Sequence, residues 1–413
     1  MEQSLKITDI GINGDGIART EEGAVVFVPF AARGDLVLAD VVKDTDGQLR
    51  GKINSILVKS PDRAAPPCRH FGICGGCSLQ HINEAAYRNF KTGQVISALE
   101  KNGVKVPADF QSIFIPHGTR RRANFACRVA KGKAVIGFHE RRSANIRNVP
   151  DCLLITEEMR GVMETLRPFL PDIIGEGQKA DILIQCIDGQ IELGITGKIA
   201  PGWEAQQALS DFLRACNASR ISLRARDFET YEMLLEEKAY FKRFDSLVVN
   251  LAPASFLQPS EEGERALTKC VMDGAGDAIR IADLFCGNGT FTGPLMDRDI
   301  VAADNAQDAI ASLQEAGIKA EVRNLFKEPY HAFDLEDRDC VILDPPRAGA
   351  NAQVKELAQS TVPKIVYVSC GPQSFAKDAG DLIKGGYVLR KLTLVDQFIW
   401  SAHTEVVGVF ERT

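Results

Sequence analysis

The pattern of hydrophobic and polar positions divides the chain into stretches with different periods. Residues 1 to about 58 contain short segments in which β-branched residues alternate with polar ones, such as "LKITDIG" and "DLVLADVVK", and turns such as residues 13–16 separate them. This alternation is typical of antiparallel strands, and several short strands in succession predict a small β-barrel. Residues 84–102 instead have apolar residues at helical spacing and end before Gly103, so we expect a helix there.

The rhythm changes in the rest of the chain. From about 110 to 250, strand-like runs such as "DILIQCID" and "QIELGI" mix with helical segments. From about 255 onward, apolar strands alternate with helices, in the order "AIRIADLF", "DIVAADN", "DCVILDPP" and "KIVYVSC". This alternation predicts a doubly wound, mostly parallel α/β sheet. We therefore expect a barrel at 1–58, a mixed α+β central domain at 59–250 and an α/β domain at 251–413.

Composition and charge restrict the class of protein. The chain has 413 residues, of which 45% are hydrophobic and 25% charged, as in globular proteins with several domains. The N-terminal segment has no signal pattern and no apolar run reaches the length of a membrane span, so eleven cysteines predict reduced thiols in the cytoplasm. A net charge of −6 requires any nucleic-acid site to be a local basic patch. Such a patch is suggested by Arg120, Arg121, Arg122, Arg128, Arg141, Arg142 and Arg147.

A glycine-rich turn follows the first strand of the α/β region, in "ADLFCGNGTFTG". Gly287 and Gly289 would allow the backbone to approach a ligand closely at the carboxyl end of that strand. The next strand ends in Asp304, which is placed to accept hydrogen bonds from ribose hydroxyls, and a third ends in Asp344. A dinucleotide site would need G-x-G-x-x-G, but Gly293 comes one residue late. A nucleoside cofactor without phosphates fits better, and S-adenosylmethionine is the usual one.

Two residues are candidates for covalent chemistry. Cys370 ends the predicted strand "KIVYVSC" beside a Gly-Pro turn, and thiolates are strong nucleophiles. Glu405 precedes an apolar strand near the end of the chain, where it could serve as a general base. Each residue taken singly has a common structural alternative. Cys370 could be a buried structural cysteine, and Glu405 could be a solvated carboxylate at the edge of a strand.

The stretch "PPCRHFGICGGC" contains three cysteines, Cys68, Cys74 and Cys77, at the spacing C-x5-C-x2-C, and Cys152 follows after 74 intervening residues. Four thiolates suit either structural zinc or a [4Fe–4S] cluster. Zinc ribbons usually show paired C-x2-C knuckles, which this sequence lacks.

These motifs together resemble the bacterial RNA 5-methyluridine methyltransferases, which use S-adenosylmethionine to methylate C5 of uracil in ribosomal or transfer RNA. The resemblance covers essentially the full length. "CRHFGICGGCSLQH" matches the iron–sulfur signature of the family, "LDPPRAGA" and "VYVSCGPQSFAKD" match its two catalytic signatures, and the front segment looks like a TRAM domain, a small RNA-binding barrel. The resemblance implies a class I S-adenosylmethionine-dependent methyltransferase domain at the C-terminal end. It also implies a structural [4Fe–4S] cluster bound by Cys68, Cys74, Cys77 and Cys152.

The resemblance also assigns roles in the reaction. It implies that Cys370 adds to C6 of the pyrimidine, that C5 then takes the methyl group, and that Glu405 removes the C5 proton. The implied cofactor contacts are Gln258, Phe285, Gly287, Thr290, Asp304, Asn324 and Asp344. Two positions depart from the family pattern, because Thr290 replaces the usual asparagine and Phe398-Ile399 replaces the usual Phe-Pro.

The expected substrate is a loop uridine of 23S ribosomal RNA, because a base inside a duplex cannot reach a cysteine. Arginines 120–122 and 141–147 are candidates for binding the surrounding phosphates. The choice of ribosomal RNA is by family analogy, since the related transfer-RNA enzymes tend to lack both the barrel and the cluster. Uridine in transfer RNA, cytosine, and a non-catalytic RNA-binding assembly factor are the alternatives. We expect a monomer that binds neither DNA nor membranes.

Overall fold

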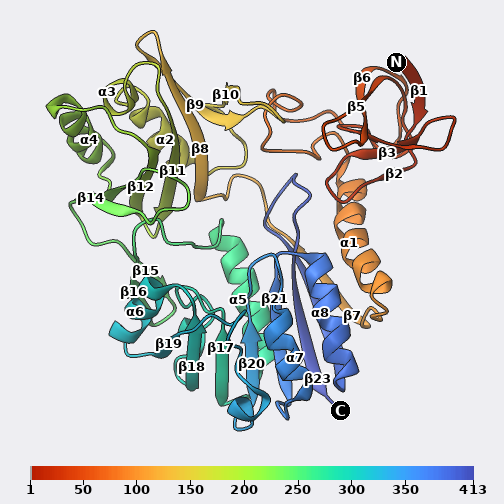
Figure 1. Cartoon of the computed structure of the whole chain (residues 1–413), viewed down its shortest axis with the longest axis vertical. Coiled ribbons are helices and arrows are strands. Elements are labelled where there is room, and N and C mark those ends of the chain that lie inside the picture. Colours follow the sequence, from red (N-terminus) through yellow and green to blue (C-terminus); the bar gives the residue numbers. More distant parts are fainter. Residues whose placement is uncertain (1) are drawn as a thin grey trace. The chain divides into compact units, whose positions relative to one another are not determined.

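The computed structural model describes residues 2–413, which form two compact units (Figure 1). The first unit contains the residues up to Ile96, together with the later segments Phe138–Arg147 and Phe398–His403. The second unit contains Ser97–Gly137, Asn148–Gln397 and Thr404–Thr413. Within residues 2–413, no helix is both long and apolar enough to cross a lipid bilayer.

The first unit begins with a small, strongly curved β-sheet. Its strands are β1 (Glu2–Lys6), β2 (Asp9–Ile10), β3 (Gly16–Arg19), β4 (Val25–Val28), β5 (Leu36–Lys43) and β6 (Leu49–Val58), in the order β1-β5-β6-β4-β3-β2. Alternate residues such as Leu5, Val26 and Val37 face a common core. The β-branched alternation in the sequence therefore predicted these strands correctly, because only one face of each strand is buried.

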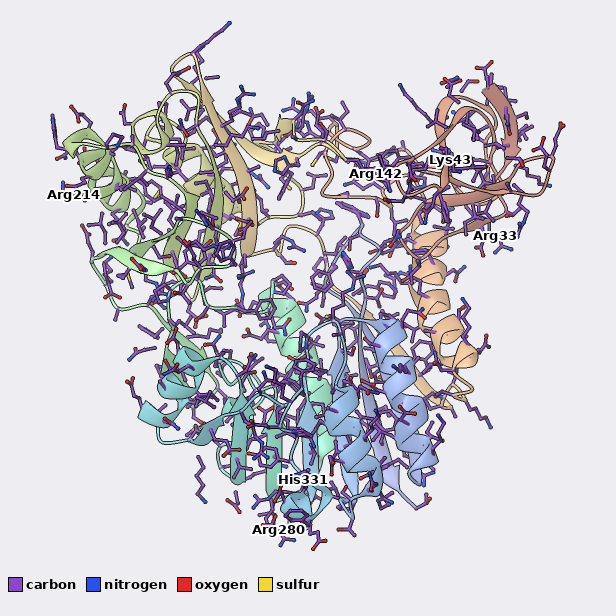
Figure 2. The ribbon with its side chains drawn as sticks, in the orientation of Figure 1. Arg33, Lys43, Arg142, Arg214, Arg280 and His331 are labelled. Carbon is purple, nitrogen blue, oxygen red and sulfur yellow. The ribbon has the colours of Figure 1, made fainter. Side chains whose placement is uncertain are left out.

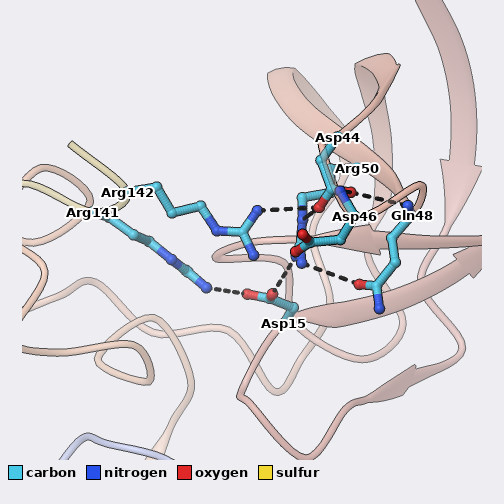
Figure 3. A network of polar contacts seen from close by, with 7 residues as sticks. All are labelled: Asp15, Asp44, Asp46, Gln48, Arg50, Arg141 and Arg142. Carbon is cyan, nitrogen blue, oxygen red and sulfur yellow. Dashed lines mark hydrogen bonds and ion pairs between the residues drawn. The ribbon is translucent and has the colours of Figure 1, made fainter.

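Ion pairs connect the turns of this sheet to the segment Phe138–Arg147 (Figure 3). Asp15 accepts from Arg141 at 2.5 Å and from Arg50 at 3.3 Å. Asp44 accepts from Nε of Arg50 at 2.5 Å and lies 3.5 Å from Arg142. The two carboxylates thus hold three guanidinium groups against one edge of the sheet.

The cysteine-rich loop and helix α1 (Glu84–Lys101) follow the sheet. Backbone hydrogen bonds connect the loop to both later segments of the first unit. The amide of Gly75 donates to the carbonyl of His139 at 2.9 Å, and that of Leu79 donates to the carbonyl of Trp400 at 3.0 Å. These bonds connect distant parts of the chain to the loop.

The second unit contains most of a mixed sheet in the order β10-β9-β8-β11-β12-β13-β14. Its strands are β8 (Arg122–Ala130), β9 (Lys133–His139), β10 (Ile146–Asn148), β11 (Lys179–Ile187), β12 (Gln190–Gly197), β13 (Arg220–Arg224) and β14 (Glu232–Glu236). The chain passes from the first unit back to the second within β10. Helices α2 (Glu157–Leu166), α3 (Leu170–Ile174) and α4 (Trp203–Cys216) accompany them. A hairpin of β15 (Phe241–Phe244) and β16 (Leu247–Asn250) leads to the next sheet.

The C-terminal sheet has the order β19-β18-β17-β20-β21-β23-β22-β7. Its strands are β17 (Arg280–Leu284), β18 (Asp299–Asp304), β19 (Lys319–Val322), β20 (Cys340–Leu343), β21 (Lys364–Ser369), β22 (Tyr387–Asp396), β23 (Glu405–Arg412) and β7 (Asp109–Phe114). The helices are α5 (Glu261–Ala275), α6 (Gln307–Glu315), α7 (Asn351–Gln359) and α8 (Pro372–Lys384), which Figure 1 shows around these strands. Strands β17 to β21 are parallel, whereas β23 is antiparallel to both neighbours.

This topology confirms the doubly wound sheet predicted from the sequence. The strand order reverses beside β17, since β18 lies on one side of it and β20 on the other. Open α/β sheets bind ligands at such a reversal, outside the carboxyl ends of the strands. Strand β7 pairs in parallel with β22, so a segment of the predicted central domain joins this sheet. The domain boundaries given above stay predictions.

Candidate functional site

A cavity of about 850 Å³ opens in the second unit at the carboxyl ends of the parallel strands. Phe285, Asp304, Asp344 and Cys370 reach it from β17, β18, β20 and β21, respectively. Glu405 begins the antiparallel strand β23, and for that reason lies at the same end of the sheet. The topology thus gathers residues that are far apart in the sequence.

The structure places all but one of the predicted cofactor and catalytic residues in the lining of this cavity. Those in the lining are Gln258, Phe285, Gly287, Thr290, Asp304, Asp344, Cys370 and Glu405. Asn324 is the exception among the described residues: its side-chain Oδ1 accepts from the amide of Phe326 at 3.2 Å, while Arg323, Leu325 and Phe326 line the cavity.

The glycine-rich turn after β17 is held to the end of β18. Oδ2 of Asp304 accepts from the amide of Gly287 at 3.0 Å, and its Oδ1 accepts from that of Ala306 at 2.9 Å. Phe285 has a φ of 63°, a left-handed conformation that a bulky residue rarely adopts and that is often found at functional sites. A carboxylate has about four acceptor positions, so Asp304 retains two for the hydroxyls of a ligand.

An aromatic pair lies beside Asp304 in the cavity lining. The ring centroids of Phe285 and Phe326 are 5.4 Å apart and their planes are inclined by 59°. Phe326 remains partly exposed, which leaves a ring surface for a flat ligand. A carboxylate for ribose and aromatic rings for adenine fit the nucleoside part of S-adenosylmethionine.

Cys370 follows β21 directly and precedes α8, whose first residue is Pro372. Its side chain is half-buried. Burial, together with the negative charges of Glu405 and Asp344, raises the pKa of its thiol above the ordinary value. The start of α8 acts in the opposite sense, because a helix N-terminus favours a nearby anion.

Glu405 is almost fully buried, and this burial raises the pKa of its carboxyl group to about 7. A hydrogen bond from Nε2 of Gln397 to its Oε2, 2.7 Å long, acts against the increase. Burial and the charges of Glu405, Asp283 and Asp304 also raise the pKa of Asp344 well above its usual range. A carboxyl group that titrates near neutral pH is suited to general acid–base catalysis.

Gln397 was not among the residues predicted from the sequence. It lies between the end of β22 and a loop, and only its contacts with Glu405 and Gln258 distinguish it from other glutamines. Phe326 was also missed, since it lies in a loop with no recognisable motif.

The predicted metal site is not supported by the geometry. Across residues 2–413, no group of three or more His, Cys, Asp or Glu side chains is placed to hold a metal ion. Cys68, Cys74 and Cys77 belong to the first unit and Cys152 to the second. Sγ of Cys74 accepts from the amide of Gly76 at 3.4 Å, a bond that a thiolate ligand would also favour.

The structure corrects the role predicted for Arg121. This side chain is buried and donates to Glu264 at 2.6 Å, so it is unavailable to a phosphate. Arg122 donates to Gln185 at 3.0 Å, and its guanidinium group lies 5.3 Å from the ring centroid of Phe256.

The arginines of the segment Phe138–Arg147 have partners within the first unit. Arg141 is paired with Asp15, and Nε of Arg147 donates to Nδ1 of His70 at 3.3 Å. The side chain of Arg142 is about half exposed, and Arg33 and Lys43 of the same unit are exposed (Figure 2). These three cations, two of which the sequence did not single out, are the better candidates for phosphate contacts in this unit.

The strand order, the acidic residue at the end of β18 and the cavity define the C-terminal sheet as a class I methyltransferase fold. The model for "tRNA (Uracil-5-)-methyltransferase" matches residues 320–413, and that for the TRAM domain matches residues 1–53. An uncharacterized RNA methyltransferase of Caulobacter vibrioides is 37% identical over 99% of this chain and 100% of its own length. The chain therefore belongs to the RNA (uracil-5-)-methyltransferase family, a family of transferases.

Two more distant proteins resemble the whole chain. The 23S rRNA (uracil(1939)-C(5))-methyltransferase of Halomonas elongata is 27% identical over 99% of this chain and 89% of its own length. The Pyrococcus abyssi tRNA (uracil-54, C5)-methyltransferase, solved with S-adenosyl-L-homocysteine, superimposes with a TM-score of 0.76 at 22% identity. That match covers 98% of this chain and 99% of the other, and it confirms the predicted fold.

Proposed function

We propose that this chain transfers a methyl group from S-adenosylmethionine to C5 of a uridine in RNA, and that 23S ribosomal RNA is its substrate. The observation that carries the proposal is the convergence of Cys370, Glu405 and Asp304 on one cavity. A nucleophile, a buried base and a nucleoside-binding carboxylate are the groups that this reaction needs.

The proposed reaction begins when the thiolate of Cys370 forms a bond to C6 of the uracil, which moves the C5–C6 electron pair onto C5 and the O4 carbonyl. Bound S-adenosylmethionine would supply an electrophilic methyl group to C5. Glu405 then accepts the C5 proton, the C5–C6 double bond forms again and the C6–S bond breaks, which returns the electron pair to sulfur. One proton is released for each methyl group transferred, and Glu405 passes it to solvent.

Asp344 assists the attack of Cys370 in this scheme. It follows the last residue of β20 and lines the same cavity as Glu405 and Cys370. Its raised pKa favours the protonated acid, which donates a hydrogen bond. We assign it to a carbonyl oxygen of the uracil, where a donor would stabilise the charge that develops during attack.

The RNA substrate is inferred from the family and from the N-terminal TRAM match. Ribosomal RNA is favoured by the full-length similarity to the Halomonas elongata enzyme, and a transfer RNA is the second candidate because of the fold shared with the Pyrococcus abyssi enzyme. Mapping of 5-methyluridine in both RNAs from cells with and without the gene tests this choice. Loss of the modification from transfer RNA alone would refute the assignment to ribosomal RNA.

The chemistry is tested with RNA that contains 5-fluorouridine at the target position. Fluorine cannot leave as a cation, so the wild-type protein should remain covalently bound to the methylated base. Cys370→Ala should give no adduct, whereas the control Cys216→Ala, at the end of α4, should behave as the wild type. Methyl transfer by Cys370→Ala at the wild-type rate would disprove the mechanism.

We also propose that Cys68, Cys74, Cys77 and Cys152 bind a structural [4Fe–4S] cluster, on the strength of their spacing and the family signature alone. No step of the reaction involves it. Protein purified without oxygen should contain about four iron and four sulfide ions, and Cys77→Ser should lose them. A colourless protein with one equivalent of zinc would refute the cluster.

A further inference from the structure

Gln397 is the first residue of the loop between β22 and β23, the strand that begins with Glu405. It follows β22 directly, and its side chain is 3% exposed. Its Nε2 donates both protons, one to Oε2 of Glu405 and one to Oε1 of Gln258, each at 2.7 Å. Both partners line the cavity, so a single amide group connects the proposed base with a predicted cofactor contact.

The first turn of helix α5 leaves room for this amide. Gly263 lies there, and a Cβ atom at that position would be 2.3 Å from Oε1 of Gln397 and 2.9 Å from its Cβ. A glycine inside a helix is less favourable than alanine, because its unfolded chain has more conformational freedom. Oγ of Ser260 would also lie 2.7 Å from that Cβ atom, so Gly263 is explained by the space that Gln397 and Ser260 need together.

The direction of the two hydrogen bonds determines the orientation of all three side chains. Oε1 of Gln397 lies against Gly263 and has no hydrogen-bond partner among the described residues, so the two bonds formed by Nε2 fix the amide. Since Oε2 of Glu405 accepts from Gln397, its Oε1 remains for a substrate proton. Since Oε1 of Gln258 is also occupied, its amide N–H groups remain for a ligand.

We propose that Gln397 is a positioning residue that holds Glu405 for removal of the C5 proton and couples it to Gln258 on the cofactor side. This inference rests on the proposed function. In the step concerned, the C5 proton moves to Oε1 of Glu405, its electron pair forms the C5–C6 double bond, and the C6–S pair returns to Cys370. Gln397 gains and loses no proton, and its N–H groups favour the carboxylate form of Glu405 before the transfer.

The first experiment separates proton removal from the earlier steps. Gln397→Met preserves the length of the side chain but removes its donors, and Gln359→Met is the matched control, because Gln359 is exposed on α7. With 5-fluorouridine RNA and S-adenosylmethionine, Gln397→Met should form the covalent adduct at the wild-type rate, since this adduct forms before proton removal.

With ordinary uridine RNA, turnover of Gln397→Met should fall at least about tenfold, which is less than the contribution of a general base itself, because Glu405 is retained. Protein–RNA adduct should accumulate on denaturing gels, and its rate of decay should require a higher pH than in the wild type. The KM for S-adenosylmethionine should rise through Gln258. Turnover and pH profile equal to the wild type, or an equal loss of both fluorouridine adduct and turnover, would overturn the proposal. A wild-type protein that forms no fluorouridine adduct would instead refute the proposed function.

A second variant leaves Gln397 itself unchanged. Gly263→Ala should push the amide away from Glu405 and produce the same accumulation of adduct. In a Gln397→Gly background, both Oε1 and Cβ of residue 397 are absent, and only Oγ of Ser260 remains close to the new methyl group, at 2.7 Å. There the additional Gly263→Ala change should lower turnover far less than it does in the wild type. Wild-type turnover of Gly263→Ala would overturn the proposal even if Gln397→Met failed to fold.

Discussion

Nη2 of Arg121 lies 2.6 Å from Oε2 of Glu264, and both side chains are buried. Nζ of Lys242 lies 3.2 Å from the other oxygen of the same carboxylate and 3.0 Å from Oδ1 of Asp188. The backbone of Arg121 also donates to the carbonyl of Pro259 at 2.8 Å. These contacts join the start of β8 to helix α5, so Arg121 supports the segment that contains Gln258.

Replacement of Arg121 by methionine should lower the free energy of unfolding by about 3 kcal/mol. This value is the lower end of the range for a buried charge that loses its partner, and we expect it because Lys242 still pairs with Glu264. The control Arg128→Met, exposed on β8, should change it by less than about 0.5 kcal/mol. Urea-induced unfolding followed by circular dichroism measures both. Equal stability of the two variants would show that the pair contributes nothing.

Asp304→Asn should weaken the binding of S-adenosylmethionine at least about tenfold, or about 1.4 kcal/mol, because ribose loses a charged acceptor. The new amide would also place a donor against the amide of Gly287 or Ala306, and thereby loosen the turn. Calorimetric titration with the cofactor measures the change, with the exposed Asp297→Asn as control. Unchanged affinity would show that the cofactor does not bind at this end of β18.

Asp15→Asn should free the segment Phe138–Arg147 at one of its contacts with the barrel, because one carboxylate serves both Arg141 and Arg50. Exchange of amide hydrogens in residues 138–147 should become faster, whereas the exposed control Asp9→Asn should leave it unchanged. If residues 138–147 were equally protected from exchange in both variants, the backbone hydrogen bonds to the cysteine-rich loop alone would account for the order of this segment.

Local patterns predicted most of the elements and many of the site residues. Buried parallel strands appear in the sequence as apolar runs, so β17, β18, β20 and β21 were recognisable. The residues at or just after the carboxyl ends of these strands were natural candidates for the cavity. Cys370 and Glu405 were candidates because of their positions beside predicted strands, and the family resemblance assigned their roles. Their common cavity depends on the antiparallel direction of β23, which no local pattern indicated.

The features that sequence alone missed depend on contacts between distant segments. Strand β7 pairs with β22 across more than 270 residues, and nothing in "DFQSIF" names its partner. Arg121 has the same chemistry as Arg128, and only burial against Glu264 separates a structural arginine from an exposed one. Gln397 and Gly263 could be interpreted only from their contact, because the amide of Gln397 occupies space that a Cβ atom at position 263 would need.

Glu405 should give the reaction a characteristic pH dependence. It removes a proton only as a carboxylate, and its pKa is raised to about 7 by burial. Decay of the Cys370–RNA adduct, measured in single turnover, should therefore slow about tenfold for each pH unit well below 7 and level off above about 8. Decay that does not vary between pH 6 and 8 would exclude Glu405 as the base.

The same shift should make Glu405 costly to the folded protein at high pH. A carboxyl group whose pKa rises on folding, from 4.5 to about 7, binds more protons in the folded than in the unfolded state, so stability falls as the pH rises through that interval. Glu405→Gln removes the charge and can still accept from Gln397. It should match the wild type below about pH 4.5 and exceed its free energy of unfolding by up to about 3 kcal/mol at pH 8. The control Glu411→Gln, whose side chain is 45% exposed, should show no such divergence in urea unfolding across this range. A Glu405→Gln variant that is less stable than the wild type at pH 8 would mean that the surroundings of Glu405 stabilise its carboxylate form.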